Sequence, residues 1–203
     1  QQNPRGYRSP SERDIAFDDL KIPCSDGVHI HAWLLKSPVP NAPVIIFFHG
    51  NAGNIGLRLT NAFQMLEHLK SNILMVEYRG YGNSDSVTPN ENGLKLDAQA
   101  ALQYCIKTFK TPIYVFGQSL GGAVAVQLAR YAESHSLALA GLILENTFTS
   151  ISDMVDVVMP LLSRIKSFVL TIGWNSRIIM RDLNTRILFL AGERDELVPH
   201  QQM

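Results

Sequence analysis

The chain has 203 residues, of which 46% are hydrophobic and 18% are charged, a balance typical of one globular domain with a sizeable core. Its 18 basic residues equal its 18 acidic residues in number, so the composition does not indicate a nucleic-acid partner or an anionic surface. The two cysteines, Cys24 and Cys105, are far apart in the sequence and are interpreted as free thiols. No run approaches the ~18 apolar residues of a membrane span.

The beginning of the chain is predicted to form a hairpin. Residues 15–23 and 27–36 have the composition of strands, and Ser25-Asp26-Gly27 between them is a turn signal. His29 and His31 alternate in the second strand and therefore share one face. Because no third metal ligand is near in the sequence, a role at the surface or in strand packing is favoured over a metal pair.

The rest of the chain alternates buried strands with helices. Continuous apolar runs are typical of strands that are covered on both faces of a parallel sheet. Such strands are expected at 44–48, 73–76, 113–116, 139–144 and 186–191, and helices at 56–69, at 91–108 and from 120 to about 132. This alternation predicts an α/β fold in which a mostly parallel central sheet has helices on both faces.

One stretch in the middle of the chain combines a strand, a tight turn and a helix. The apolar run 113–116 ends in Gly117-Gln118-Ser119-Leu120-Gly121, and a helical pattern follows at once. This is the nucleophile-elbow pattern, in which a serine is held in a strained backbone conformation and a side chain at position 117 or 121 would crowd the turn. The helix N-terminus would favour negative charge beside the serine. We interpret Ser119 as the nucleophile, with a plain turn between strand and helix as the alternative.

Other polar groups are expected at the same edge of the sheet. His49-Gly50, Ser119, Glu145 and Asp195 each come just after the end of a predicted strand. In parallel sheets the active site lies at the carboxyl ends of the strands. Residues 150–183 interrupt the alternation, because this segment is apolar and longer than one crossover helix requires. It is expected either to form a small lid over the site or to pack on the sheet, within a single domain that spans residues 1–203.

These motifs together resemble the α/β-hydrolase superfamily. The resemblance rests on the elbow and on the segments His49-Gly50-Asn51-Ala52-Gly53-Asn54, Tyr78-Arg79-Gly80-Tyr81-Gly82-Asn83-Ser84 and Gly192-Glu193-Arg194-Asp195. Two further segments, Glu145-Asn146-Thr147-Phe148 and Gly6-Tyr7-Arg8-Ser9-Pro10, are similar to the branch of membrane-associated serine hydrolases around alpha/beta hydrolase domain-containing protein 13. The resemblance implies a membrane anchor upstream of Gln1, so the full-length protein is expected to be membrane-associated and this fragment soluble.

The resemblance also implies roles for individual residues. Ser119 would attack an acyl carbonyl, and the N–H groups of Leu120 and Asn51 would form the oxyanion hole. Asp195 is the expected acid of the triad, with Glu145 as the runner-up. The catalytic histidine is expected beyond Met203, so that the chain would be truncated before the last strand and would be inactive.

Two functional interpretations remain open. The first is a serine hydrolase that cleaves carboxylic ester or thioester bonds, in a lipid or an S-acylated protein, without a metal or cofactor. The second is a non-catalytic binding or scaffold protein that has kept the fold, because the catalytic histidine is not found in this sequence. A serine in place of aspartate at the nucleophile position argues against the dehalogenase and epoxide-hydrolase chemistries of this fold.

Overall fold

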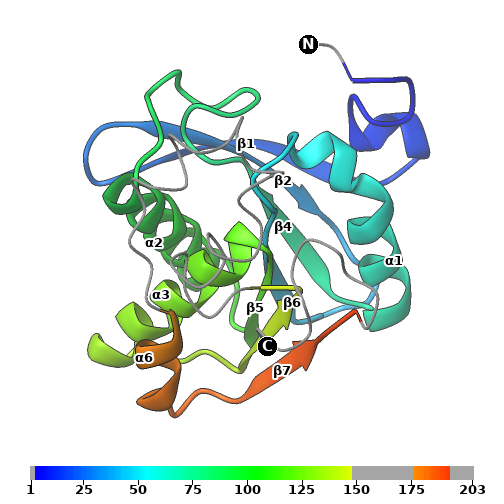
Figure 1. Cartoon of the computed structure of the whole chain (residues 1–203). Helices are drawn as coiled ribbons and strands as arrows, with labels where there is room; N and C mark the ends of the chain where they lie inside the picture. Colours follow the sequence, from blue (N-terminus) through cyan, green and yellow to red (C-terminus); the bar gives the residue numbers. More distant parts are fainter. Residues whose placement is uncertain (1–2, 148–175, 193–203) are drawn as a thin grey trace.

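A computed structural model describes residues 3–147 and 176–192 of the chain (Figure 1). The described residues form a seven-stranded sheet in the order β1-β2-β4-β3-β5-β6-β7. The strands are β1 Phe17–Pro23, β2 His29–Leu35, β3 Val44–Phe48, β4 Asn72–Val76, β5 Ile113–Gln118, β6 Gly141–Glu145 and β7 Ile187–Leu190. β2 is antiparallel to both β1 and β4, and all the other pairs are parallel. The predicted α/β fold with a mostly parallel sheet is confirmed.

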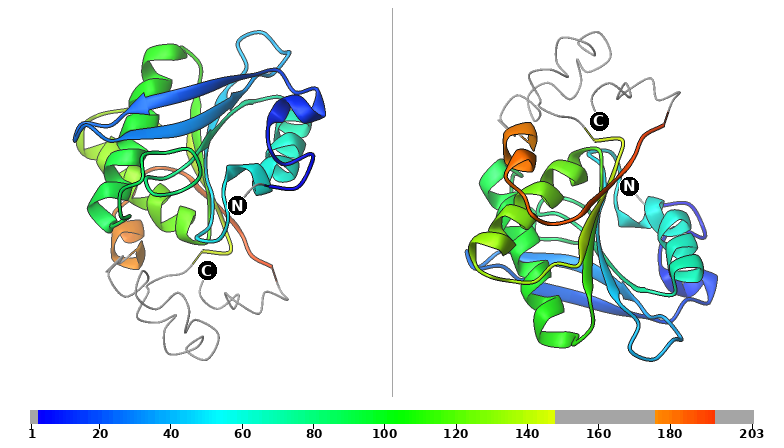
Figure 2. Two further views of the ribbon diagram at one scale, coloured as in Figure 1. Left: turned by 90° about the horizontal axis from the view of Figure 1, so that it is seen from above. Right: turned by 90° about the horizontal axis from the view of Figure 1, so that it is seen from below.

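Helices lie on both faces of the sheet. The α-helices are α1 Leu59–Leu69, α2 Glu91–Thr108, α3 Leu120–Ser134 and α6 Ser176–Arg181, and the short 3-10 helices are η1 Pro10–Arg13 and η2 Ile55–Arg58. Figure 2 shows α1 on one side of the sheet and α2, α3 and α6 on the other. Helix α3 packs on β3, β5 and β6, and α1 packs on β4. The central strands are therefore covered by helices on both faces.

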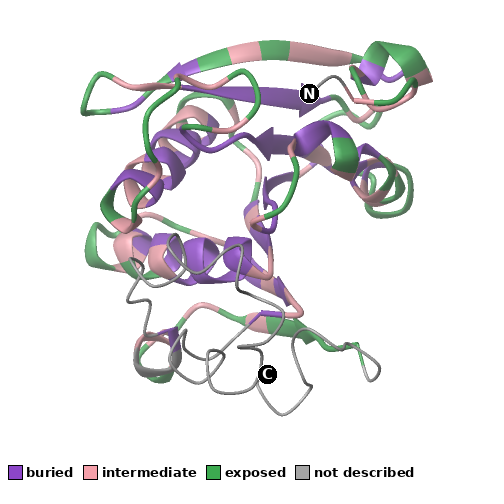
Figure 3. Cartoon of the chain, turned by 45° about the horizontal axis from the view of Figure 1, so that its top comes forward, coloured by how far each residue is buried: buried purple, intermediate pink, exposed green. Residues whose placement is uncertain are grey.

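The continuous apolar run of β3 reflects burial on both of its faces. Val44, Ile46 and Phe48 belong to the core cluster that includes residues of α2 and α3. Ile45 and Phe47 belong to the second cluster, on the side of α1. Figure 3 shows the central strands buried, whereas β1 and β7 at the two edges carry many exposed or half-buried residues. The centre of the sheet is thus a rigid base for the loops that follow its strands.

The structure differs from the sequence-based expectations mainly at the ends of elements. The helix expected at 56–69 begins as the 3-10 turn η2, because the Asn54 side chain caps it by accepting a hydrogen bond from Leu57 N. β6 begins at Gly141 because that residue is the register partner of Tyr114 in β5. Of the segment 150–183, residues 150–175 lie outside the described residues, so the lid remains a prediction. The last part of this segment forms α6, which packs on α3.

A buried ion-pair cluster ties the loop after β4 to α2 and to the β1–β2 turn. Arg79 Nε donates to Asp97 Oδ1 over 2.9 Å, and Arg79 Nη1 donates to Asp26 Oδ2 over 2.7 Å. Arg79 is 3% exposed and Asp97 is fully buried. A buried charge is tolerated when it is paired and hydrogen-bonded. The cluster therefore fixes the position of the chain that continues into Gly80-Tyr81-Gly82.

The two histidines of the hairpin contact carboxylates. His31 Nε2 lies 2.7 Å from Asp19 Oδ1, and His29 Nδ1 lies 3.4 Å from Asp85 Oδ2. The His31 side chain is buried in the sheet, where its ring packs edge-on against Trp33. Within the described residues, no group of three His, Cys, Asp or Glu side chains could hold a metal ion. Both cysteines are free and buried, which confirms their interpretation as thiols.

Candidate active site

Ser119 lies at the apex of the turn between β5 and α3, in a strained backbone conformation. Its φ of 51° and ψ of −117° lie in a region that L-residues rarely adopt, at a cost of about 1–3 kcal/mol. Hydrogen bonds hold it there: its N–H donates to the Glu145 carbonyl over 3.0 Å, and its carbonyl accepts from Thr147 Oγ1 over 3.0 Å. The side chain does not cap α3. The strained serine expected from the sequence is thus present.

The glycines on either side of Ser119 allow three chain segments to meet. A methyl group on Gly117 would overlap the carbonyl of Gly121. A methyl group on Gly121 would lie 2.6 Å from the carbonyl carbon of Phe48, at the end of β3. Real Cβ atoms do not approach other atoms so closely. Glycine at these two positions therefore lets α3 begin directly against β5 and β3, as the sequence predicts.

The loop after β3 lies directly beside the serine. A methyl group built on Gly50 would be 3.5 Å from Ser119 Cβ. The loop is held by two tyrosines that follow β4: the Tyr78 hydroxyl donates to the His49 carbonyl over 2.8 Å, and the Tyr81 hydroxyl donates to Asn51 Oδ1 over 2.7 Å. The loop that follows β4 thus holds the loop that follows β3, on the side next to Ser119.

The two tyrosines retain their protons over the physiological pH range. Burial raises the pKa of Tyr81 to about 12, with a smaller contribution from the negative charge of Glu77. Burial also raises the pKa of Tyr78 well above its usual value. A neutral phenol donates a hydrogen bond, whereas a phenolate can only accept one. Both hydroxyls are therefore permanent donors to the loop after β3.

His49 is fully buried between these two loops. Its Nδ1 lies 2.7 Å from the Gly50 carbonyl oxygen, and its Nε2 lies 3.4 Å from Glu77 Oε1. Its ring packs on the ring of Tyr78, with a centroid distance of 4.6 Å. The other Glu77 oxygen, Oε2, accepts from Ile55 N over 3.3 Å. The His49 ring therefore contacts residues of the loops after β3 and β4, and these contacts do not include Ser119.

Comparison with known proteins identifies the family. Residues 40–182 match the model of the Hydrolase_4 family, described as serine aminopeptidase, S33. The chain belongs to this family of α/β-hydrolases. Protein bem46 of Schizosaccharomyces pombe is 40% identical over 98% of this chain and 69% of its own length. The alpha/beta hydrolase domain-containing protein WAV2 of Arabidopsis thaliana is 38% identical over 96% of this chain and 68% of its own length.

Two further similarities concern the fold and the membrane. The esterase Pf2001 of Pyrococcus furiosus superposes on 96% of this α/β-hydrolase chain and 76% of its own chain with a TM-score of 0.75, at 20% identity, so the shared feature is the fold. The Saccharomyces cerevisiae protein YNL320W, named an uncharacterized membrane protein, is 35% identical over 94% of this chain and 67% of its own length. In the described part of this chain, no helix is long and apolar enough to cross a membrane.

The α/β-hydrolase fold brings several of the predicted site residues together. Leu120 is the first residue of α3 and is buried, and Asn51 lies in the loop beside Ser119. Glu145 ends β6, and its Oε2 accepts from Gln118 Nε2 over 3.3 Å. Asp195 lies outside the described residues, so its assignment as the acid remains a prediction.

Sequence reasoning missed the residues that hold the site in place. Thr147 and the two tyrosines after β4 make the hydrogen bonds described above. The signals in the sequence were that Tyr78 and Tyr81 stand in the motif that follows β4 and that Thr147 stands in the segment that follows β6. The motif does not show that the two tyrosines contact the loop after β3. That contact depends on the parallel pairing of β3 with β4, which brings the loops after the two strands to the same edge of the sheet.

Proposed function

We propose that the protein is a serine hydrolase that cleaves carboxylic ester or thioester bonds through an acyl-enzyme at Ser119. The Ser119 oxygen attacks the acyl carbon, its proton passes to a base, and the alcohol or thiol leaves with a proton. Water then attacks the acyl-enzyme, which releases the carboxylic acid and restores the serine. The N–H groups of Leu120 and Asn51 would stabilise the oxyanion of both tetrahedral intermediates.

The observation that carries this proposal is the strained conformation of Ser119 between β5 and α3, with φ of 51° and ψ of −117°. Strain of this kind persists only where the surrounding structure enforces it, and it is concentrated at functional sites. It turns the serine away from the regular backbone of both elements, towards the loop that contains Gly50. Membership of a hydrolase family supports the same reaction class.

The acid and the base of the triad are proposed by resemblance to the family. Asp195 would orient a histidine, and the histidine would take the proton of Ser119. The proposed substrates are acyl esters or thioesters of lipids or of S-acylated proteins. Association with a membrane is proposed as well, because a relative of similar sequence is named a membrane protein.

Labelling of the full-length protein with a fluorophosphonate probe tests the proposal. The probe should label the wild-type protein and should fail to label Ser119→Ala. Ser134→Ala is the matched control, because Ser134 is an exposed residue at the opposite end of α3, and it should be labelled like the wild type. Hydrolysis of p-nitrophenyl butyrate should fall by ~10³-fold or more in Ser119→Ala. Equal labelling of wild type and Ser119→Ala would refute the assignment and favour the non-catalytic alternative.

A further inference from the structure

An arginine borders the space beside the proposed nucleophile. Arg58 is the last residue of η2, and its Nη2 donates to the Ala52 carbonyl over 3.0 Å. A methyl group built on Gly50 would be 4.0 Å from Arg58 Nη2 and 3.5 Å from Ser119 Cβ. The guanidinium and the serine are therefore both within ordinary contact distance of the position that a side chain at Gly50 would take, together with the Gln118 carbonyl oxygen at 3.6 Å.

The charge of Arg58 is not neutralised by the described part of the chain. No carboxylate of the described residues forms an ion pair with it. Its Nε atom is buried and has no hydrogen-bond partner. Arg79, by contrast, is paired with both Asp26 and Asp97. Buried donors are nearly always satisfied, and an exception requires a specific explanation.

The positive charge acts on the loop beside the serine. Burial raises the pKa of the Tyr78 phenol, the negative charges of Asp97 and Glu77 raise it further, and the charge of Arg58 lowers it by a smaller amount. The Tyr78 hydroxyl donates to the His49 carbonyl, next to Gly50. An anion held next to Gly50 would lie close to the Arg58 guanidinium and to the N-terminus of α3, and both favour negative charge.

We propose that Arg58 binds an anionic oxygen group of the substrate, a carboxylate or a phosphate, close to the acyl carbon that Ser119 attacks. This inference rests on the proposed function. A guanidinium presents several N–H donors in one plane, which matches the oxygens of a carboxylate or phosphate. The preferred substrates are accordingly esters or thioesters that carry a negative charge within a few bonds of the scissile carbonyl.

Matched pairs of esters test this specificity in the full-length protein. In the first pair, mono-p-nitrophenyl succinate carries the charge on the acyl side, and its methyl ester is the neutral control. In the second group, 4-acetoxybenzoate and 4-acetoxyphenyl phosphate carry a carboxylate or a phosphate on the leaving group, and methyl 4-acetoxybenzoate is neutral. The measured quantity is the ratio of kcat/KM for the anionic ester to kcat/KM for the neutral ester.

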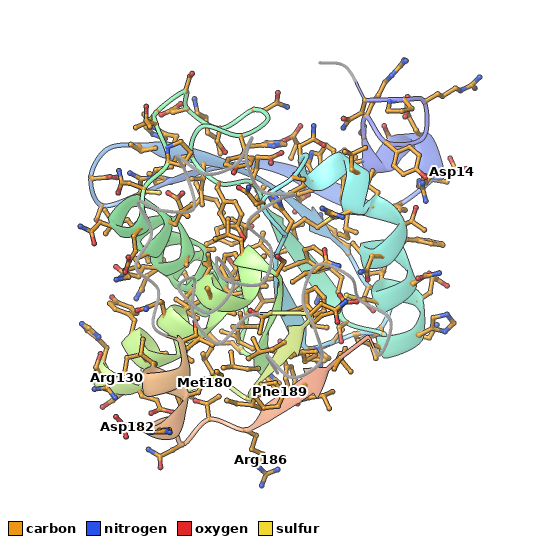
Figure 4. All side chains as sticks on the ribbon, in the orientation of Figure 1. Asp14, Arg130, Met180, Asp182, Arg186 and Phe189 are labelled. Carbon is orange, nitrogen blue, oxygen red and sulfur yellow. The ribbon has the colours of Figure 1, made fainter. Side chains whose placement is uncertain are left out.

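The Arg58→Gln variant should lower this ratio by roughly 10- to 100-fold, the effect of losing one charge-assisted contact. Arg58→Lys should recover part of the ratio, because it restores the charge without the planar geometry. Arg130→Gln is the matched control, since Arg130 is exposed near the far end of α3, close to α6 (Figure 4), and it should leave the ratio unchanged. The group of esters that shows the effect identifies the position and kind of the anion.

A uniform fall in kcat/KM for anionic and neutral esters would overturn the inference, because it would mean that Arg58 only holds the loop through Ala52. Binding can also be measured without turnover, in Ser119→Ala, by titration with monomethyl succinate and with methyl phosphate. At least one of these anions should bind, and Arg58→Gln in the same background should weaken its binding by about tenfold or more. Binding that does not depend on Arg58 would refute the inference, whether or not Ser119 proves to be the nucleophile.

Discussion

Replacement of Gly121 by alanine tests how α3, β3 and the loop beside Ser119 fit together. The added methyl group would lie 2.6 Å from the Phe48 carbonyl carbon and 2.9 Å from the His49 carbonyl oxygen. The methyl group would also overlap the Phe48 carbonyl oxygen, and contacts of 3.4 Å or more are ordinary for a Cβ atom, so the helix or the loop would have to move by close to an ångström. β3 cannot shift easily, because it is hydrogen-bonded to β4 on one side and to β5 on the other.

The expected cost follows from two opposing effects. Overpacking of this kind costs about 1–3 kcal/mol, while the better helix propensity of alanine recovers at most ~1 kcal/mol. The free energy of unfolding should therefore fall by about 1–2 kcal/mol, which corresponds to a Tm lower by about 2–8 °C in a chain of this size. The rate of ester hydrolysis should fall by roughly 100-fold even where the variant is fully folded, because the displaced loop lies beside Ser119.

Thermal unfolding followed by circular dichroism and hydrolysis of p-nitrophenyl butyrate below the Tm measure the two effects separately. Gly141→Ala is the matched control: its methyl group would meet no atom closer than the Arg186 carbonyl oxygen at 3.4 Å, so its Tm should equal or slightly exceed that of the wild type. If Gly121→Ala had the stability and the activity of Gly141→Ala, the close contact between α3 and the end of β3 would be wrong.

Two further predictions concern buried groups away from the serine. Arg79→Met should lower the free energy of unfolding, measured in urea, by about 3–5 kcal/mol, because it leaves the buried Asp97 carboxylate without its ion-pair partner. Lys21→Met is the control: it removes an exposed ion pair and should lower the free energy of unfolding by less than ~1 kcal/mol. Burial raises the pKa of the Cys24 thiol to about 12, and burial also raises the pKa of the Cys105 thiol above its usual value. Neither thiol should therefore be alkylated by iodoacetamide at pH 8 in the folded protein, and both should react in urea. Rapid alkylation of the native protein would contradict this burial.

Local sequence patterns were sufficient to predict most elements of the sheet and the turn that carries the serine. The run 113–116 followed by Gly-x-Ser-x-Gly predicts a strand, a strained turn and a helix, and the structure has β5, Ser119 with φ of 51° and α3. The physical reason is that burial on two faces, backbone strain and helix initiation each depend on neighbouring residues. The assignment of the helix start at position 56 was less accurate, because the cap at Asn54 permits an initial 3-10 turn.

Contacts between distant segments were decided by the tertiary structure alone. β4 lies between β2 and β3, and this order brings Tyr78 and Tyr81 to the loop that contains Asn51. The same packing brings both Arg58 and Ser119, which are 61 residues apart in the sequence, next to Gly50. No local pattern encodes such pairings, since they depend on which face of the sheet each helix covers and on how each crossover returns the chain. The amino-acid sequence therefore determined the strained turn that carries Ser119, the proposed nucleophile, whereas the arrangement of the strands determined which side chains surround it.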